Sequence, residues 1–413
     1  MPAISNHDAL ITGCCIAGGG PAGMMLGFLL ARAGVEVVVL EKHPDFLRDF
    51  RGDTIHPSTL EVIRELGLLD EFLKLPHEEA RRLSGIIGDE LVRLVDFTHL
   101  RTRCRFIAMM PQWDFLNFLA GHAERYPNFH LRMQAEVTDL LEEGGRIAGV
   151  RASTPAGLLT IRSTLIVGAD GRHSVVRKRA GLVVDDLGAS IDVLWMRLSR
   201  RPSDGVEPLG RIVAGNMMVM INRGDYWQCA FLIAKSGADK VRARGLESFR
   251  AAIVELMPNL YDRVGEIGSW DDVKLLTVKV DRLRRWYRPG LLCIGDAAHA
   301  MSPVGGVGIN LAIQDAVAAA NRLVGPLRNG AVSECDLSDV QRRRMFPTRA
   351  TQRMQVFIHD KFLSRVLASR TTPAPPWVVR LLGHWPILQR IPARIVGLGF
   401  RPEHVHTPSP SHP

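Results

Sequence analysis

A glycine-rich turn near the N-terminus is the first group of residues whose types and spacing suggest chemistry. Its sequence is Gly18-Gly19-Gly20-Pro21-Ala22-Gly23, a Gly-x-Gly-x-x-Gly pattern. The first glycine permits a tight turn, the second lets backbone approach a pyrophosphate, and the third allows close packing of helix on sheet. Glu41 follows eighteen residues after Gly23, where its carboxylate can accept hydrogen bonds from ribose hydroxyls. The turn predicts a site for a dinucleotide without a 2′-phosphate, FAD or NAD, with Pro21, Ala22 and Lys42 as further contacts.

The elements around this turn favour that interpretation over a chance cluster of glycines. Cys14 to Ala17 is an apolar strand, and Met24 to Ala33 is a helix-forming stretch that ends at Gly34. Glycine caps helices well because it adopts the left-handed conformation without a Cβ clash. The Val-rich run from Val35 to Glu41 is typical of a buried parallel strand. Together these segments predict a βαβ unit.

Two more apolar segments, at residues 165–170 and 291–296, each end in an aspartate, and a helix is expected after the second from about Asn310 to Arg322. Short strands ending in Gly or Asp, far apart in the chain, indicate one nucleotide-binding sheet interrupted by insertions. The segment between them differs, because it predicts an antiparallel insertion with a hairpin turn at 222–225. Its expected strands are 191–198, 216–222 and 226–233.

The motifs Gly168-Ala169-Asp170-Gly171 and Gly295-Asp296-Ala297-Ala298-His299, with Pro303 and Gly305 to Ala312, resemble one known family. This is the single-component flavoprotein monooxygenases, the aromatic hydroxylases typified by 4-hydroxybenzoate hydroxylase. The resemblance spans roughly residues 10–185 and 280–325. It implies an α/β fold: a Rossmann-like FAD-binding domain with a mixed parallel sheet and helices, an inserted antiparallel-sheet substrate domain and a C-terminal helical tail. The expected domains are FAD-binding at 1–75, 101–186 and 281–340, substrate at 76–100 and 187–280, and C-terminal helices at 341–413.

The resemblance also implies roles for single residues around FAD. Arg51 is expected to reach the flavin phosphates, unless it is a surface arginine. Gln112 is expected beside the flavin linker, unless it only begins a helix. Asp170 is expected to serve both FAD and the nicotinamide cofactor, unless it merely caps the next turn. The other implied contacts are Gly18, Gly20, Gly23 and Glu41 for the ADP half, Asp296 for the ribityl chain, and Gly306, Gly308, Ile309 and Asn310 near the flavin pyrimidine.

The chain carries no second Gly-x-Gly-x-x-Gly unit, so NADPH or NADH is expected as a transient co-substrate. The implied reaction is reduction of FAD, addition of O₂ to give a flavin C4a-hydroperoxide, and hydroxylation of an aromatic substrate that is phenolic, a polyketide or a quinone precursor. Such a site must exclude water. Pro303 is expected to present its backbone carbonyl to the substrate, and His56, Tyr226 and His299 are candidates for a base. Candidate lining side chains are Met217, Met218, Val219, Met220, Trp227 and Phe231, unless they form the core of the sheet, since alternation sends half of them to the other face.

Three other functions stay open. Halogenases that share this fold carry a Trp-x-Trp-x-Ile-Pro motif, but no two tryptophans in this chain are separated by a single residue. Reductases of isoprenoid double bonds share the FAD motifs, although their aromatic signature is not found. A flavin-binding ligand sensor without turnover is the third alternative.

Composition excludes several classes of protein. The 413 residues include 52 Lys and Arg against 43 Asp and Glu, but the basic residues are dispersed, which argues against nucleic acid binding. Six cysteines without Cys-x-x-Cys spacing indicate no metal site and suit a reducing cytoplasm. No apolar run reaches membrane-spanning length. The tail from Trp377 to Arg390 could rest on a membrane surface, or pack on the core or on a second copy, so both monomer and homodimer stay possible.

Overall fold

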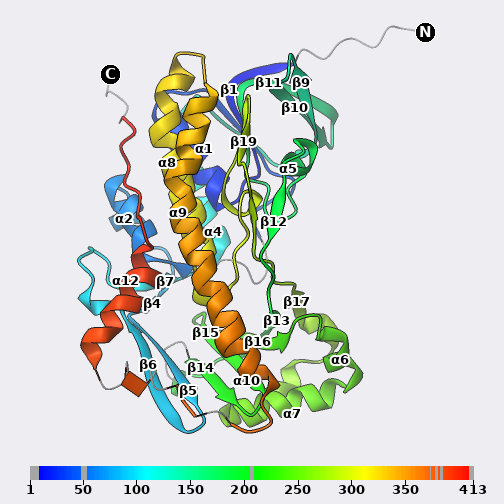
Figure 1. The fold of residues 1–413 in the computed structure, drawn as a ribbon, viewed down its shortest axis with the longest axis vertical. Coiled ribbons are helices and arrows are strands. Elements are labelled where there is room, and N and C mark those ends of the chain that lie inside the picture. The colour runs from blue at the N-terminus through cyan, green and yellow to red at the C-terminus, as the bar shows by residue number, and fades with distance from the viewer. Residues whose placement is uncertain are drawn as a thin grey trace.

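A mixed eight-stranded sheet occupies the upper part of the molecule in Figure 1. The computed structural model describes residues 9–47, 54–204, 209–372, 374–376, 380–381 and 385–408. Five strands of this sheet are parallel, in the order β20-β11-β1-β2-β8, and β9, β10 and β19 pair antiparallel at its margins. The strands are β1 (Leu10–Ala17), β2 (Val37–Leu40), β8 (Phe129–Arg132), β9 (Glu136–Glu143), β10 (Arg146–Thr154), β11 (Gly157–Gly168), β19 (Tyr287–Arg288) and β20 (Leu291–Cys293).

The expected βαβ unit is present, and its first strand begins at Leu10 rather than Cys14. The helix α1 (Pro21–Arg32) packs against α4 (Gln112–Ala123) and α8 (Gly308–Arg328). Gly34 has a φ of +78°, as a glycine after a helix end should. The strands expected at 165–170 and 291–296 are the ends of β11 and β20. Parallel strands share a carboxyl edge, so the glycine turn and both aspartates meet there.

A seven-stranded sheet occupies the lower part of the molecule (Figure 1). Its pairs are antiparallel except for β14 with β5, and both β5 and β6 come from residues 76–100. The expected hairpin at 222–225 joins β15 to β16, which confirms that prediction. The strands, in sheet order, are β17 (Lys274–Leu276), β13 (Ile191–Ser199), β16 (Tyr226–Ala234), β15 (Asn216–Asn222), β14 (Leu209–Val213), β5 (Arg82–Ile87) and β6 (Glu90–Asp96).

Helices lie on both faces of this sheet: those of residues 238–256 on one face, and the helical segment of residues 358–367 on the other, where it packs against Val193 and Leu232. The sequence analysis did not predict α6 (Ala238–Ala243) and α7 (Leu246–Leu256), which enclose a core with Met218, Trp227 and Phe231. The smaller elements are β3 (Thr54–Ile55), β4 (Glu78–Ala80) and β7 (Ile107–Met109) in one sheet, β12 (Val184–Asp186) with β18 (Asp281–Leu283) in another, and the helices α2 (Pro57–Glu65), α3 (Leu69–Phe72) and α5 (Val175–Arg179).

A long helix, α9 (Glu334–Ile358), runs from the upper to the lower part of the molecule and continues through a π-helical turn into α10 (Ser364–Ala368) (Figure 1). The boundary expected at residue 341 falls inside α9, and the division into domains stays a prediction. The last helix, α12 (Arg390–Leu398), packs against α2 and β6. Its buried side is formed by Ala393 and Gly397, while Ile387 and Ile391 are exposed.

Candidate active site

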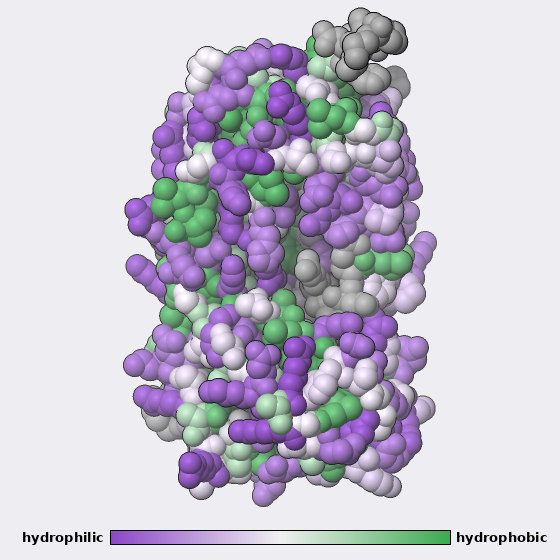
Figure 2. Space-filling model, turned by 90° about the vertical axis from the view of Figure 1, so that its right-hand side faces the viewer, coloured by the Kyte–Doolittle hydropathy of each residue, from purple (hydrophilic) through white to green (hydrophobic). Residues whose placement is uncertain are grey.

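One cavity of about 610 Å³ lies at the carboxyl edge of the parallel strands and reaches the seven-stranded sheet. In α/β sheets, this edge is where ligands bind. The upper sheet contributes the turn after β1, the residues after β2 and the aspartate segments, and the lower sheet contributes Trp195, Ile221, Gln228 and Leu276. On the face shown in Figure 2, a hollow lies between the two parts of the molecule.

The glycine turn has the geometry that its sequence predicted. Gly18 has a φ of +107°, and a Cβ there would lie 2.4 Å from the carbonyl oxygen of Ala169. A Cβ on Gly23 would lie 1.9 Å from the oxygen of Gly18, so this glycine allows close packing and does not line the cavity. A Cβ on Gly20 would meet nothing within 4 Å. The turn therefore leaves open space where a pyrophosphate would approach the backbone.

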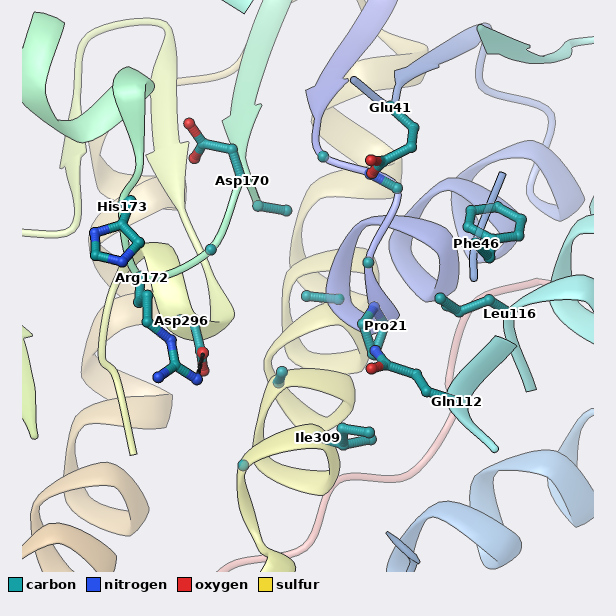
Figure 3. Close-up of a pocket in the computed structure, with 18 of the residues that line it drawn as sticks. Pro21, Glu41, Phe46, Gln112, Leu116, Asp170, Arg172, His173, Asp296 and Ile309 are labelled. Atoms are coloured by element: carbon teal, nitrogen blue, oxygen red, sulfur yellow. Dashed lines mark hydrogen bonds and ion pairs between the residues drawn. The ribbon is translucent and has the colours of Figure 1, made fainter. Parts of the chain in front are cut away.

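Glu41 lies beside the glycine turn on the right of Figure 3. Its Oε2 accepts a hydrogen bond from the Gly19 N–H at 2.9 Å, and its Oε1 accepts one from the His43 N–H at 3.1 Å. These bonds fix the carboxylate at the lining of the cavity, next to Lys42. Oxygens fixed in this way can still accept from ribose hydroxyls, because each carboxylate has about four acceptor sites.

Two helix N-termini reach the cavity, through Pro21 of α1 and through Gly308 and Ile309 of α8. Neither has a side-chain cap or an acidic residue in its first turn. Their free N–H groups and positive dipole ends suit anionic groups. Gly306 before α8 has a φ of +62°, and a Cβ there would lie 2.4 Å from Thr54 Oγ1.

Both aspartates lie on the left of Figure 3, where Asp296 is beside Arg172 and Asp170 lies above them. Asp170 Oδ2 accepts from the Val176 N–H at 3.1 Å, so this residue does cap the next turn. Its Oδ1 is buried and has no hydrogen-bond partner among the described residues, and burial raises the pKa of the carboxyl. Asp296 Oδ2 lies 3.9 Å from Arg172 Nη2.

These residues fit FAD. The open side of Gly20, the Glu41 carboxylate, two uncapped helix ends and the unpartnered Asp170 oxygen offer the contacts that a dinucleotide needs. Gln112 lies at the start of α4 and lines the cavity, as Pro303 also does. Arg51 lies outside the described residues.

Asn310 and His56 do not line the cavity. The Asn310 side chain donates to the carbonyl oxygens of Thr54 at 3.0 Å and Gly306 at 3.2 Å, and its Oδ1 accepts from the His56 N–H at 2.8 Å. His56 is fully buried, its Nδ1 lies 2.7 Å from the Val396 oxygen, and burial lowers its pKa to about 4. Both residues hold the segment that begins α8 in place.

The other two base candidates also lie outside the described lining. Tyr226 contacts Arg197, whose guanidinium carbon lies 4.9 Å from the ring centroid. His299 is buried, with Nε2 2.6 Å from Asp315 Oδ2. The structure therefore brings none of the three candidates to the cavity.

None of the six apolar candidates on β15 and β16 lines the cavity, and they belong to the core of the sheet, which was the alternative. Met218, Met220, Trp227 and Phe231 instead pack toward α7. Strand alternation places their neighbours Ile221 and Gln228 on the cavity side. Arg172 and His173 were also missed, although they directly follow Asp170-Gly171. Phe46 and Leu116 line the cavity without any sequence signal.

The chain is similar to known flavoproteins in sequence and in fold. A family model described as an FAD binding domain matches residues 12–354. The 6-methylpretetramide 4-monooxygenase of Streptomyces rimosus is 34% identical over 396 residues, which cover 93% of each chain. The solved p-nitrophenol 4-monooxygenase of Pseudomonas putida matches with a TM-score of 0.74 at 21% identity, over 93% of this chain and 97% of that one.

A flavin-dependent brominase has a similar fold, with a TM-score of 0.75 at 15% identity, over 94% of this chain and 93% of the brominase. The fold alone is thus shared by different flavin chemistries, and the relative at 34% identity is a monooxygenase. The chain belongs to the family of FAD-dependent aromatic monooxygenases.

Proposed function

We propose that this enzyme binds FAD in the cavity, uses NADPH or NADH as a transient reductant, and hydroxylates a phenolic, polyketide or quinone-precursor ring. The observation that carries the proposal is the single cavity that joins the glycine turn to one face of the seven-stranded sheet. The S. rimosus relative, named for a 6-methylpretetramide substrate, favours a ring of polyketide type.

The proposed FAD contacts are those expected from the sequence except Gly23 and Asn310, which do not line the cavity. Glu41 and the glycine turn would hold the ADP half, and Asp296 and the start of α8 the flavin half, with Lys42, Gln112 and Asp170 between them. Arg51 stays a proposed phosphate contact. When bound, FAD would supply hydride acceptance from the nicotinamide and activation of O₂, so that one oxygen atom enters the ring.

The protein's own contribution to this chemistry is charge placement and dryness. The N-terminal end of α8 would stabilise negative charge on the reduced flavin, because no acidic side chain in its first turn offsets its dipole. Trp195, Ile221 and Leu276 would keep water from the reacting ring. Pro303 would present its backbone carbonyl to the substrate.

The nicotinamide cofactor is proposed to visit rather than to stay. Arg172 and His173 line the cavity beside Asp170, where positive charge would attract the phosphates of the nicotinamide cofactor.

Among the described helices, none combines the length and the apolar character that a membrane span requires. Contact of the C-terminal tail with a membrane surface, and the choice between monomer and homodimer, stay predictions.

A screen of phenols and polycyclic hydroxyaromatics tests the proposal. We expect yellow protein, nicotinamide oxidation stimulated by some ring compounds, O₂ consumption, and a product one oxygen atom heavier. If the protein is loaded with FAD but no ring compound stimulates its nicotinamide oxidation, the ligand-sensor alternative would remain. Product formation without O₂ consumption would favour the reductase.

A further inference from the structure

The end of the cavity against the seven-stranded sheet is lined mainly by apolar side chains, and Arg172 is a charged lining residue that reaches it, because its Nη1 donates to the Thr277 carbonyl oxygen at 3.3 Å. Trp195, Ile221 and Leu276 line this end, close to the loop that carries Met301 and Pro303. Ser302 in that loop already bonds to His359, with Oγ and Nε2 2.7 Å apart. The acidic lining residues, Glu41, Glu136, Asp170 and Asp296, all belong to the strands of the upper sheet or to the segments that follow them.

Among the described lining residues, Gln228 is the one amide at this end. It lies on β16 and is 3% exposed. Its Oε1 accepts a hydrogen bond from Arg223 Nε at 2.9 Å. Since an arginine can only donate, this contact also fixes which amide atom is the oxygen. No described residue bonds to Nε2, so the amide has donors left for a ligand in the cavity.

Arg223 is held in the hairpin turn between β15 and β16. Its backbone N–H donates to the Tyr226 oxygen at 3.0 Å, and the Gly224 N–H donates to Asn222 Oδ1 at 2.9 Å. The guanidinium stays charged at any working pH. Its hydrogen bond to Oε1 polarises the Gln228 amide, and a polarised amide N–H is a stronger donor toward negative charge.

We propose that Gln228, backed by Arg223, recognises an anionic oxygen of the substrate, the phenolate or enolate of a hydroxylated ring. The amide favours the ionised form on binding, so the substrate hydroxyl loses its proton to solvent water and no side-chain base is required. An ionised ring is also the more electron-rich one. The relevance to hydroxylation rests on the proposed function, whereas the binding of the anion does not.

Spectral titration of the FAD-loaded protein tests this proposal. The probes are 4-nitrophenol and 2-hydroxyanthraquinone, whose phenol and phenolate forms differ in colour. We expect the wild type to bind the phenolate preferentially, so that the probe's pKa is lower when bound. Gln228→Leu should weaken phenolate binding about 10- to 100-fold, the range for a lost hydrogen bond to a charged group, and raise the bound pKa by about one to two.

Two further variants separate the parts of the recognition group. Gln228→Glu keeps a partner for Arg223 but places a negative charge beside the phenolate, so phenolate binding should fall at least as far as in Gln228→Leu. Arg223→Met keeps the amide and removes the polarising charge, so the loss should be smaller, about tenfold or less.

The matched control is Gln341→Leu. Gln341 is a second glutamine whose amide oxygen accepts a hydrogen bond, from the Trp286 N–H at 3.0 Å, but its Nε2 donates to the Arg284 oxygen at 2.9 Å and it lies outside the described lining. Its phenolate binding should match the wild type, and each variant is checked for FAD content and thermal unfolding.

Two results overturn the proposal: wild type that binds neither phenolate, or Gln228→Leu with wild-type affinity and wild-type pKa of the bound probe. Failure of the proposed function would look different. In that case the phenolate would bind in a Gln228-dependent way, and no ring compound would stimulate nicotinamide oxidation.

Discussion

Gln355 on α9 holds the loop that carries Pro303. Its Oε1 accepts from the Ser302 N–H at 3.0 Å, and its Nε2 donates to the carbonyl oxygens of Ser302 and Val304, both at 3.0 Å. The side chain is fully buried. Both Ser302 and Pro303 line the cavity, so the helix sets the position of this part of the lining.

Gln355→Leu keeps the volume and removes all three hydrogen bonds. A buried N–H and two carbonyls lose their partner, each at about 1–3 kcal/mol, partly offset by the second acceptor sites of the carbonyls and by the apolar replacement. We expect a loss of about 3 kcal/mol in the free energy of unfolding. Gln355→Glu should not rescue it, because a carboxylate cannot donate to the two carbonyls.

The functional assay is coupling, the share of consumed nicotinamide that yields hydroxylated product rather than H₂O₂. A displaced loop would admit water, so Gln355→Leu should release more H₂O₂ at an unchanged FAD content. Gln341→Leu, on the same helix, should keep wild-type coupling. Wild-type stability with wild-type coupling would refute the reasoning, and lost stability with unchanged coupling would show that Gln355 serves folding alone.

Three other predictions concern the cofactor and pH. Asp296→Ala should lose most of its flavin, measured by absorbance after desalting, and a fully loaded variant would remove Asp296 from the proposed contacts. Arg51→Ala should weaken FAD retention or slow flavin reduction, and unchanged values for both would make it a bystander. Burial lowers the pKa of His56 to about 4 in the folded protein, below the value of about 6.5 expected in the unfolded chain. On acidification the unfolded state therefore binds the proton first. The free energy of unfolding should fall as the pH drops from about 6.5 to about 4. The difference between these two pKa values corresponds to about 3 kcal/mol of stability. Denaturant titrations across this pH range should show that the wild type loses this amount and that His56→Gln does not.

Sequence alone predicted the parts of the site that depend on backbone geometry. The turn around Gly18 needs glycine because any Cβ would clash, so residue type and spacing reveal it. Asp170 and Asp296 follow apolar strands, and parallel strands bring such ends together. Gln228 could have been found too, since alternation along β16 places it opposite the buried Trp227.

The rest depends on contacts between segments that no local pattern encodes. His56 and His299 looked like bases because histidine titrates near neutral pH, but each is buried against a partner distant in the chain, Val396 and Asp315. Sequence also left open whether Met218 and Trp227 line the cavity or fill the core, because apolar character does not tell which sheet face a helix covers. Here α7 covers theirs.

The polar face of α9 explains how residues far from the cavity edge can govern it. Buried polar side chains recur every three or four residues along one side, an inversion of the usual apolar stripe. Gln352 donates to the carbonyl oxygens of Asp281 and Ala300. One turn later, Gln355 bonds to Ser302 and Val304. Successive turns of α9 therefore hold successive parts of the segment that leads to the cavity. An apolar helix would pack there without fixing the register of that segment, because dispersion contacts are not directional. The same face also links this segment to the C-terminal end of the chain, since Arg344 bonds to Asp315 at 2.8 Å and to Glu403 at 3.2 Å. Substitutions on this face should therefore lower the coupling of nicotinamide oxidation to hydroxylation while FAD affinity stays unchanged. Measuring both quantities separates the position of the loop from the binding of the cofactor.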